Sequence, residues 1–224
     1  RAGGGGLEKG GLAATGARRS PPPLRTRSRP SMPQRRSSTG PSPAHPSPNR
    51  PSPVRLIVQV RPGRPTEGVI RLGALAVPCR LGRTGVTRFK REGDGATPVA
   101  AMRVLAVLYR ADRIARPATR LPVRALRRDD GWCDAPGDGR YNRPVRLPFS
   151  PSHEALWRDD SVYDVVVVLD WNVTRRSQRR GSAIFFHLTR PEPAPTAGCV
   201  AVTLPAMRRL LARLRPGAVL AVRG

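Results

Sequence analysis

Aromatic residues, lysines and long hydrophobic runs are scarce in this sequence. Phe, Trp and Tyr together make up 4% of the 224 residues, which leaves few side chains for stacking on nucleic-acid bases. The apolar run at 165–169 is far too short to cross a bilayer, so we expect no transmembrane segment. Residues 1–53 lack the apolar core that a signal peptide has, so no export signal is visible.

Cysteine and histidine are also few, with three of each. The spacing of Cys79, Cys133 and Cys199 contains no C-x-x-C and suggests neither a disulfide framework nor a zinc site. We therefore predict no metal and no cofactor. Cys79 and Cys133 could pair with each other, but the interpretation that we favour is two buried thiols.

Acidic residues are outnumbered, with 15 Asp and Glu against 41 Lys and Arg, and the formal net charge is +26. Nearly all of the positive charge is arginine, because Lys9 and Lys90 are the only lysines. This bias, together with abundant Gly, Ala, Pro and Val, also fits a codon preference that needs no function. Because no nucleic-acid-binding motif is present, nucleic acid is not an expected partner, and Arg-driven binding of nucleic acid is our third alternative.

Residues 1–53 do not have the composition of a folded domain. They contain 11 Pro and 8 Gly, no aromatic residue and almost no large apolar side chain. Such a segment cannot bury enough surface to offset its conformational entropy, so we predict a disordered tail. It could serve as a spacer or bind anions. It could equally be translated upstream sequence, because the first residue is Arg1 and Met32 is a candidate start.

Residues 54–224 carry the apolar pattern of one mainly β domain. Alternation of apolar and polar residues in 54–60 and 99–109 predicts strands with one buried face. The β-branched run in 162–169 predicts a strand that is buried on both faces. Further strands are expected at 67–72, 74–81, 182–188 and 218–222.

One or two short helices complete this expected domain. The apolar residues of 204–214 fall on one helical face, and Thr203 is placed to begin that helix. A second short helix is predicted at 153–160, with Ser152 as its N-cap. The Arg-rich segment 111–128 is interpreted as a solvated connection.

The stretch 181–202 combines a strand that carries His187 near its end, a loop with three prolines, and a Gly198–Cys199 turn. The thiolate is the reactive form of cysteine, and a neighbouring imidazole is the usual means of forming it near neutral pH. A Gly before the nucleophile lets backbone N–H groups surround a developing oxyanion. From spacing alone, a small core cysteine and a structural histidine are an open alternative.

His187, followed by Pro195-Thr196-Ala197-Gly198-Cys199-Val200, resembles the signature of the L,D-transpeptidase catalytic domain (YkuD) family. That signature is a His, a loop, and Ser/Thr-x-Gly-Cys before an apolar residue. The segment Gly93–Pro98 resembles the family's upstream Gly-rich Thr-Pro segment, which is expected to shape the floor of the cleft. The resemblance covers roughly 54–224 and implies an L,D-transpeptidase-like β-sandwich or barrel as the catalytic domain.

Three departures from the commoner form of the signature indicate a divergent branch. Ala197 stands where that form has a second His. Val200–Val202 follow the cysteine where Arg or Asn is common, and the loop from His187 to Cys199 is shorter than usual. These departures leave room for a non-catalytic cell-wall-binding module of the same fold.

The resemblance implies a bacterial acyl transferase for peptidoglycan stem peptides, with Cys199 as nucleophile and His187 as base. The backbone carbonyl of Leu188 is expected to orient the imidazole, and the N–H groups of Ala197, Gly198 and Cys199 to hold the oxyanion. The thioester would pass to an amine, which cross-links the cell wall and so affects cell shape, or to water in L,D-carboxypeptidase-type hydrolysis. A periplasmic or cell-envelope location is implied, and we expect a monomer.

Five further side chains are candidate substrate contacts: Thr196, Trp132, Tyr141, Arg143 and Arg180. Long loops with aromatic and turn residues often line binding sites. For Trp132 and Tyr141, the slightly favoured alternative is that the rings plug the edge of the core. For Arg180, the commoner case is a solvated charge, although an arginine at a cleft mouth could bind a carboxylate.

Overall fold

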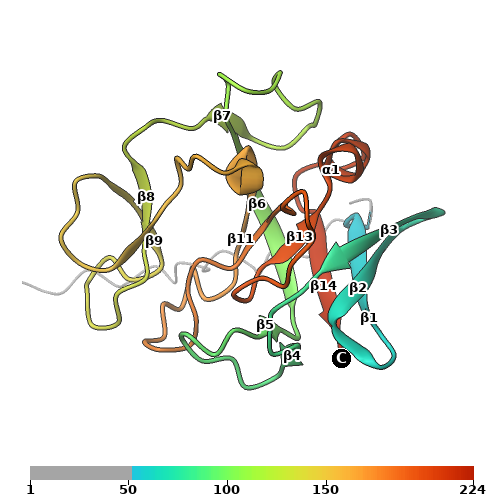
Figure 1. The fold of residues 1–224 in the computed structure, drawn as a ribbon, viewed down its shortest axis with the longest axis horizontal. Coiled ribbons are helices and arrows are strands. Elements are labelled where there is room, and N and C mark those ends of the chain that lie inside the picture. The colour runs from blue at the N-terminus through green and yellow to red at the C-terminus, as the bar shows by residue number, and fades with distance from the viewer. Residues whose placement is uncertain (1–51) are drawn as a thin grey trace, which may run out of the picture. The chain divides into compact units, whose positions relative to one another are not determined.

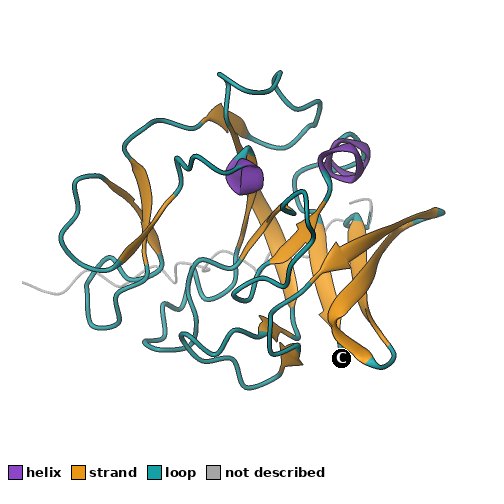
Figure 2. Cartoon of the chain, in the orientation of Figure 1, coloured by secondary structure: helices purple, strands orange, loops and turns teal. Residues whose placement is uncertain are grey.

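The protein is described by a computed structural model, in which residues 52–224 are placed. The disordered tail expected from the sequence lies, up to residue 51, outside the described residues. The described part is mainly β, as predicted, and most of its strands belong to one large sheet (Figures 1 and 2).

The large sheet has nine strands in the order β11-β12-β13-β3-β2-β1-β14-β6-β7, and an additional pairing joins β11 to β6. That pairing closes the sheet on itself into a barrel, with β7 as an extra strand beside β6. The strands are β1 (Arg55–Arg61), β2 (Arg64–Leu72), β3 (Leu75–Arg80), β6 (Ala101–Tyr109), β7 (Val123–Ala125), β11 (Val165–Leu169), β12 (Phe185–Leu188), β13 (Val200–Val202) and β14 (Val219–Arg223).

The remaining elements are small. Figure 1 shows β8 and β9 set apart from the large sheet. They form a three-stranded sheet in the order β10-β8-β9, from Asp130–Cys133 (β8), Arg143–Arg146 (β9) and His153–Ala155 (β10). A parallel pair joins Val86–Thr87 (β4) to Thr97–Pro98 (β5), and the helices are the 3-10 turn η1 (Ser161–Tyr163) and α1 (Leu204–Leu211).

The main core combines the inward-facing strand residues with the buried face of α1. Thr203 is extended and precedes the helix, and a proline stands in its first turn, as the sequence predicts. Met207, Leu210 and Leu211 are fully buried. Burial of each such side chain contributes about 1.5–3 kcal/mol, so α1 anchors the end of β13 firmly against the barrel.

The predicted strand at 162–169 is confirmed in its second half. All five residues of β11 are buried, because β6 and β12 flank the strand and core side chains cover both faces. The first residues of the run form η1 instead of a strand.

Two predictions outside the barrel are wrong. The segment 153–160 is not a helix, because His153–Ala155 pairs antiparallel with β8 and the long-range pairing overrides the local capping signal of Ser152. The segment 111–128 is not wholly solvated. It contains β7, which pairs parallel with β6, and it buries Leu121 and Leu126.

Candidate active site

Two neighbouring parallel strands place His187 and Cys199 on the same face of the sheet. His187 of β12 is paired with Ala201 of β13. Cys199 lies two residues before Ala201, and side chains alternate between the faces of a strand, so Cys199 and His187 point the same way. The backbone N–H of Phe185 donates to Cys199 Sγ at 3.3 Å, which confirms that the cysteine lies beside β12.

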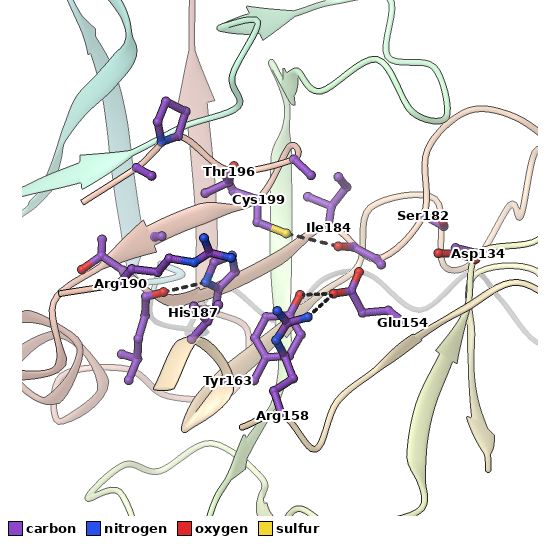
Figure 3. Close-up of a pocket in the computed structure, with 18 of the residues that line it drawn as sticks. Asp134, Glu154, Arg158, Tyr163, Ser182, Ile184, His187, Arg190, Thr196 and Cys199 are labelled. Carbon is purple, nitrogen blue, oxygen red and sulfur yellow. Dashed lines mark hydrogen bonds and ion pairs between the residues drawn. The ribbon is translucent and has the colours of Figure 1, made fainter. Parts of the chain in front are cut away.

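A cavity of about 340 Å³ opens over this face and is lined by both residues (Figure 3). Cys199 lines this cavity and is 8% exposed, and it also packs in a buried cluster with Phe185 and Trp132. In Figure 3, Asp134 lies beside Ser182, at the end of the drawn site away from His187. The charged side chains that line the cavity are Lys90, Glu92, Asp134, Glu154, Arg158 and Arg190.

The imidazole of His187 is held in one orientation. Its Nδ1 lies 2.8 Å from the carbonyl oxygen of Leu188, which can only accept, so Nδ1 carries the proton and Nε2 is the unprotonated nitrogen. Tyr163 packs against the ring at 5.3 Å between centroids in an edge geometry. Burial lowers the pKa of His187 to about 4, so the ring is neutral at physiological pH. The catalytic role assigned to this contact stays a prediction.

The thiol of Cys199 is also neutral in this structure. Burial raises its pKa to about 12. Sγ donates to the carbonyl of Ala183 at 3.3 Å and accepts from the N–H of Phe185. Within 52–224 the hydrogen bonds of Sγ therefore go to backbone groups and not to the His187 ring. In this structure the pair is therefore a neutral thiol and a neutral imidazole.

Two threonine hydroxyls fix the turn that carries Cys199. Thr196 Oγ1 donates to the Cys199 carbonyl at 2.7 Å, and Thr97 Oγ1 donates to the same oxygen at 3.2 Å. Thr97 also accepts the N–H of Gly82 at 2.8 Å, which ties the Thr-Pro segment under the turn. Thr196 lines the cavity, but its hydroxyl is used within the turn.

Gly198 is required at its position for steric reasons. Its φ is +137°, and a Cβ there would come within 2.9 Å of the carbonyl oxygen of Ala96. Its N–H donates to Thr196 Oγ1 at 3.1 Å. This N–H is therefore engaged within the turn. The use of the N–H groups of Ala197, Gly198 and Cys199 as oxyanion donors stays a prediction.

The structure does not bring the other four candidate contacts to this cavity. Trp132 and Tyr141 are buried. Trp132 packs edge-on against Phe185, and the Tyr141 hydroxyl bonds Glu92, so both rings support the cavity wall from behind. Arg143 lies on β9, and Arg180 lines a separate surface hollow.

Sequence reasoning missed several groups that line the cavity. Most come from segments far from the signature, and no spacing links them to it. Lys90 could have been singled out from the sequence, because it is one of only two lysines in a chain rich in arginine. The missed lining residues are Lys90, Glu92, Asp134, Glu154, Arg158 and Tyr163.

The other two cysteines lie away from this site. Cys79 and Cys133 are free and buried, as the favoured interpretation predicts. Burial raises the pKa of the Cys79 thiol to about 12 and also raises that of Cys133. Neither cysteine lines the cavity that holds Cys199 and His187. In the described range, no group of three or more His, Cys, Asp and Glu side chains could hold a metal ion, and no helix has the length and apolar character to cross a membrane.

Comparison with known proteins agrees with the site geometry. The L,D-transpeptidase catalytic domain (YkuD) family matches residues 55–222, which include the whole barrel and both His187 and Cys199. A search of curated proteins gives no match. With more than half of its length matched, the chain belongs to the L,D-transpeptidase catalytic domain (YkuD) family.

Proposed function

We propose that this protein is an acyl transferase that uses Cys199 to act on peptidoglycan stem peptides in the cell envelope. The observation that supports this most strongly is that His187 of β12 and Cys199, just before β13, line one cavity in a chain of this family. A neutral imidazole with Nε2 unprotonated can accept the thiol proton, which is the requirement for a general base.

In the proposed acylation, the S–H proton of Cys199 moves to His187 Nε2 as sulfur bonds to the carbonyl carbon of a stem-peptide bond. The carbonyl electron pair moves to oxygen, and the oxyanion collapses to expel the amine of the cleaved bond. That amine takes the proton from the imidazolium, which restores the neutral ring. A thioester on Cys199 remains, and an acceptor amine or water then attacks it.

The charges in the cavity suit a zwitterionic peptide substrate. Arg190 offers a guanidinium group to a carboxylate, and Asp134 offers a carboxylate to an ammonium group. Arg158 and Glu154 are already paired with each other at 3.5 Å, and Arg158 also binds Asp160 at 2.8 Å. Asp134 Oδ1 is buried with no hydrogen-bond partner in the described chain, so a ligand donor would satisfy it. Peptidoglycan stem peptides carry groups of both signs.

A test of the function is incubation with purified peptidoglycan fragments, followed by mass spectrometry of the products. Transpeptidation predicts cross-linked dimers with loss of the leaving amine, and hydrolysis by the same site predicts shortened monomers. Cys199→Ser is the matched control, because it keeps the size of the side chain and removes the thiolate, and it should give neither product. Product formation by the Cys199→Ser variant at the wild-type rate would contradict the proposal.

A second candidate is a non-catalytic cell-wall-binding module. The observation that favours it is the buried thiol, whose pKa is about 12. This candidate predicts retention of the protein on peptidoglycan without any change in the fragments, so the same experiment separates the two functions.

A further inference from the structure

Lys90 is a buried cation that the mechanism above does not use. The residue is 3% exposed. Its Nζ donates to Asp94 Oδ1 at 2.5 Å and to the carbonyl of Arg91 at 3.0 Å. An ammonium group has three N–H donors, so one donor is left after these two bonds within the described chain.

Lys90 reaches the turn that carries the nucleophile. It lines the same cavity as Cys199. Its Nζ lies 3.5 Å from the point that a Cβ on Gly198 would occupy, so the ammonium lies next to the Gly198–Cys199 turn. Of the three heavy atoms nearest to the Cβ position of Gly198, the Lys90 Nζ is the one that carries a positive charge.

The partner of Lys90 is itself strongly held, which keeps the ammonium in place. Asp94 accepts the N–H of Arg91 at 2.7 Å and the N–H of Ala96 at 2.9 Å in addition to the lysine. The positive charge also acts on the nucleophile. Burial raises the pKa of the Cys199 thiol, and Lys90 is the cation that acts in the opposite direction.

We propose that Lys90 is a catalytic residue whose ammonium binds the substrate carbonyl oxygen as it becomes an oxyanion on attack by Cys199. This inference rests on the proposed acyl transfer. The Lys90 ammonium supplies a hydrogen-bond donor for the oxyanion, whereas the N–H of Gly198 is engaged by Thr196. A fixed positive charge that is itself buried stabilises developing negative charge far more than a charge in water does.

The test compares the rate at which meropenem acylates the wild type and two variants, followed by intact-mass spectrometry. Lys90→Met keeps the length of the side chain and removes the charge, and we expect a rate about 100-fold lower. Arg91→Met is the matched control. It removes one positive charge from the adjacent residue, whose side chain is exposed and does not line the cavity, and its rate should stay within about twofold of wild type.

Alkylation of Cys199 by iodoacetamide separates the proposed role from a general loss of reactivity. Alkylation forms no oxyanion, so Lys90→Met should slow it less than tenfold while acylation falls about 100-fold. An equal loss in both reactions, or acylation within threefold of wild type, would overturn the role of Lys90.

Circular dichroism and thermal unfolding show whether the Lys90→Met variant is folded. If it is not, Lys90→Gln, which retains a donor for Asp94, takes its place with the same two criteria. Failure of meropenem to acylate the wild type would instead count against acyl transfer itself, and the Lys90 inference would fall with it.

Discussion

Replacement of His187 by Gln is expected to lower the rate of Cys199 acylation about 1,000-fold, within the range that general base catalysis contributes. Gln can still donate to the Leu188 carbonyl, as Nδ1 of the imidazole does at 2.8 Å, but its amide cannot take up the thiol proton. The substitution therefore removes the base and spares the local hydrogen bond.

The pH dependence of the same reaction gives a sharper criterion. The pKa of His187 is about 4, so its base form is saturated above pH 5 and the wild-type rate should be nearly flat from pH 5 to 9. In His187→Gln only the thiolate fraction reacts, and the Cys199 pKa is about 12, so the residual rate should rise about tenfold per pH unit. Identical profiles for the two proteins would show that another group acts as the base.

The stability of the protein should fall at mildly acidic pH because of His187. The pKa of this ring is about 4 in the folded protein, against 6.5 for an unperturbed histidine. Between these values the unfolded chain binds the proton and the folded chain does not, so stability decreases as pH falls from 6.5 towards 4. The shift corresponds to a loss of up to about 3 kcal/mol in the free energy of unfolding.

Denaturant unfolding at pH 7, 5.5 and 4.5 measures this effect. Carboxylates also titrate in this range, but they are shared by the wild type and His187→Gln, so the difference between the two proteins isolates the histidine. As pH falls, the free energy of unfolding of the wild type should decrease relative to that of His187→Gln by up to about 3 kcal/mol. A difference that stays constant would mean that the buried ring does not resist protonation.

The strands with a clear apolar period could be predicted from the sequence. Alternation in 54–60 corresponds to β1, the β-branched run contains β11, and the one-sided apolar pattern after Thr203 corresponds to α1. The apolar pattern alone does not predict the closure of the barrel, because the pairing of β11 with β6 joins segments about 60 residues apart and leaves no local signal. The family resemblance implied a sandwich or a barrel. The false helix at 153–160 has the same cause, since β8 recruits His153–Ala155 as a strand.

The candidate site was accessible to sequence reasoning only near its signature. His187 lies on β12 and Cys199 immediately precedes the adjacent strand β13, so a motif of about thirteen positions contains both. Lys90, Glu154 and Tyr163 reach the cavity from three distant segments, and the burial that sets their chemistry depends on the folded barrel. For Trp132 and Tyr141 the sequence offered a binding role that the structure does not support. Their loop has the composition of a binding loop, but Trp132 packs against Phe185 and the Tyr141 hydroxyl bonds Glu92.

The central claim is that Cys199, with His187 beside it, is a nucleophile that forms an acyl-enzyme. Intact-mass spectrometry after incubation with a carbapenem, followed by peptide mapping, tests this most directly. We predict one covalent adduct per wild-type chain, located on the peptide that contains Cys199, and none on Cys199→Ser. A wild-type protein that stays unmodified, or an equal adduct on Cys199→Ser, would contradict the claim.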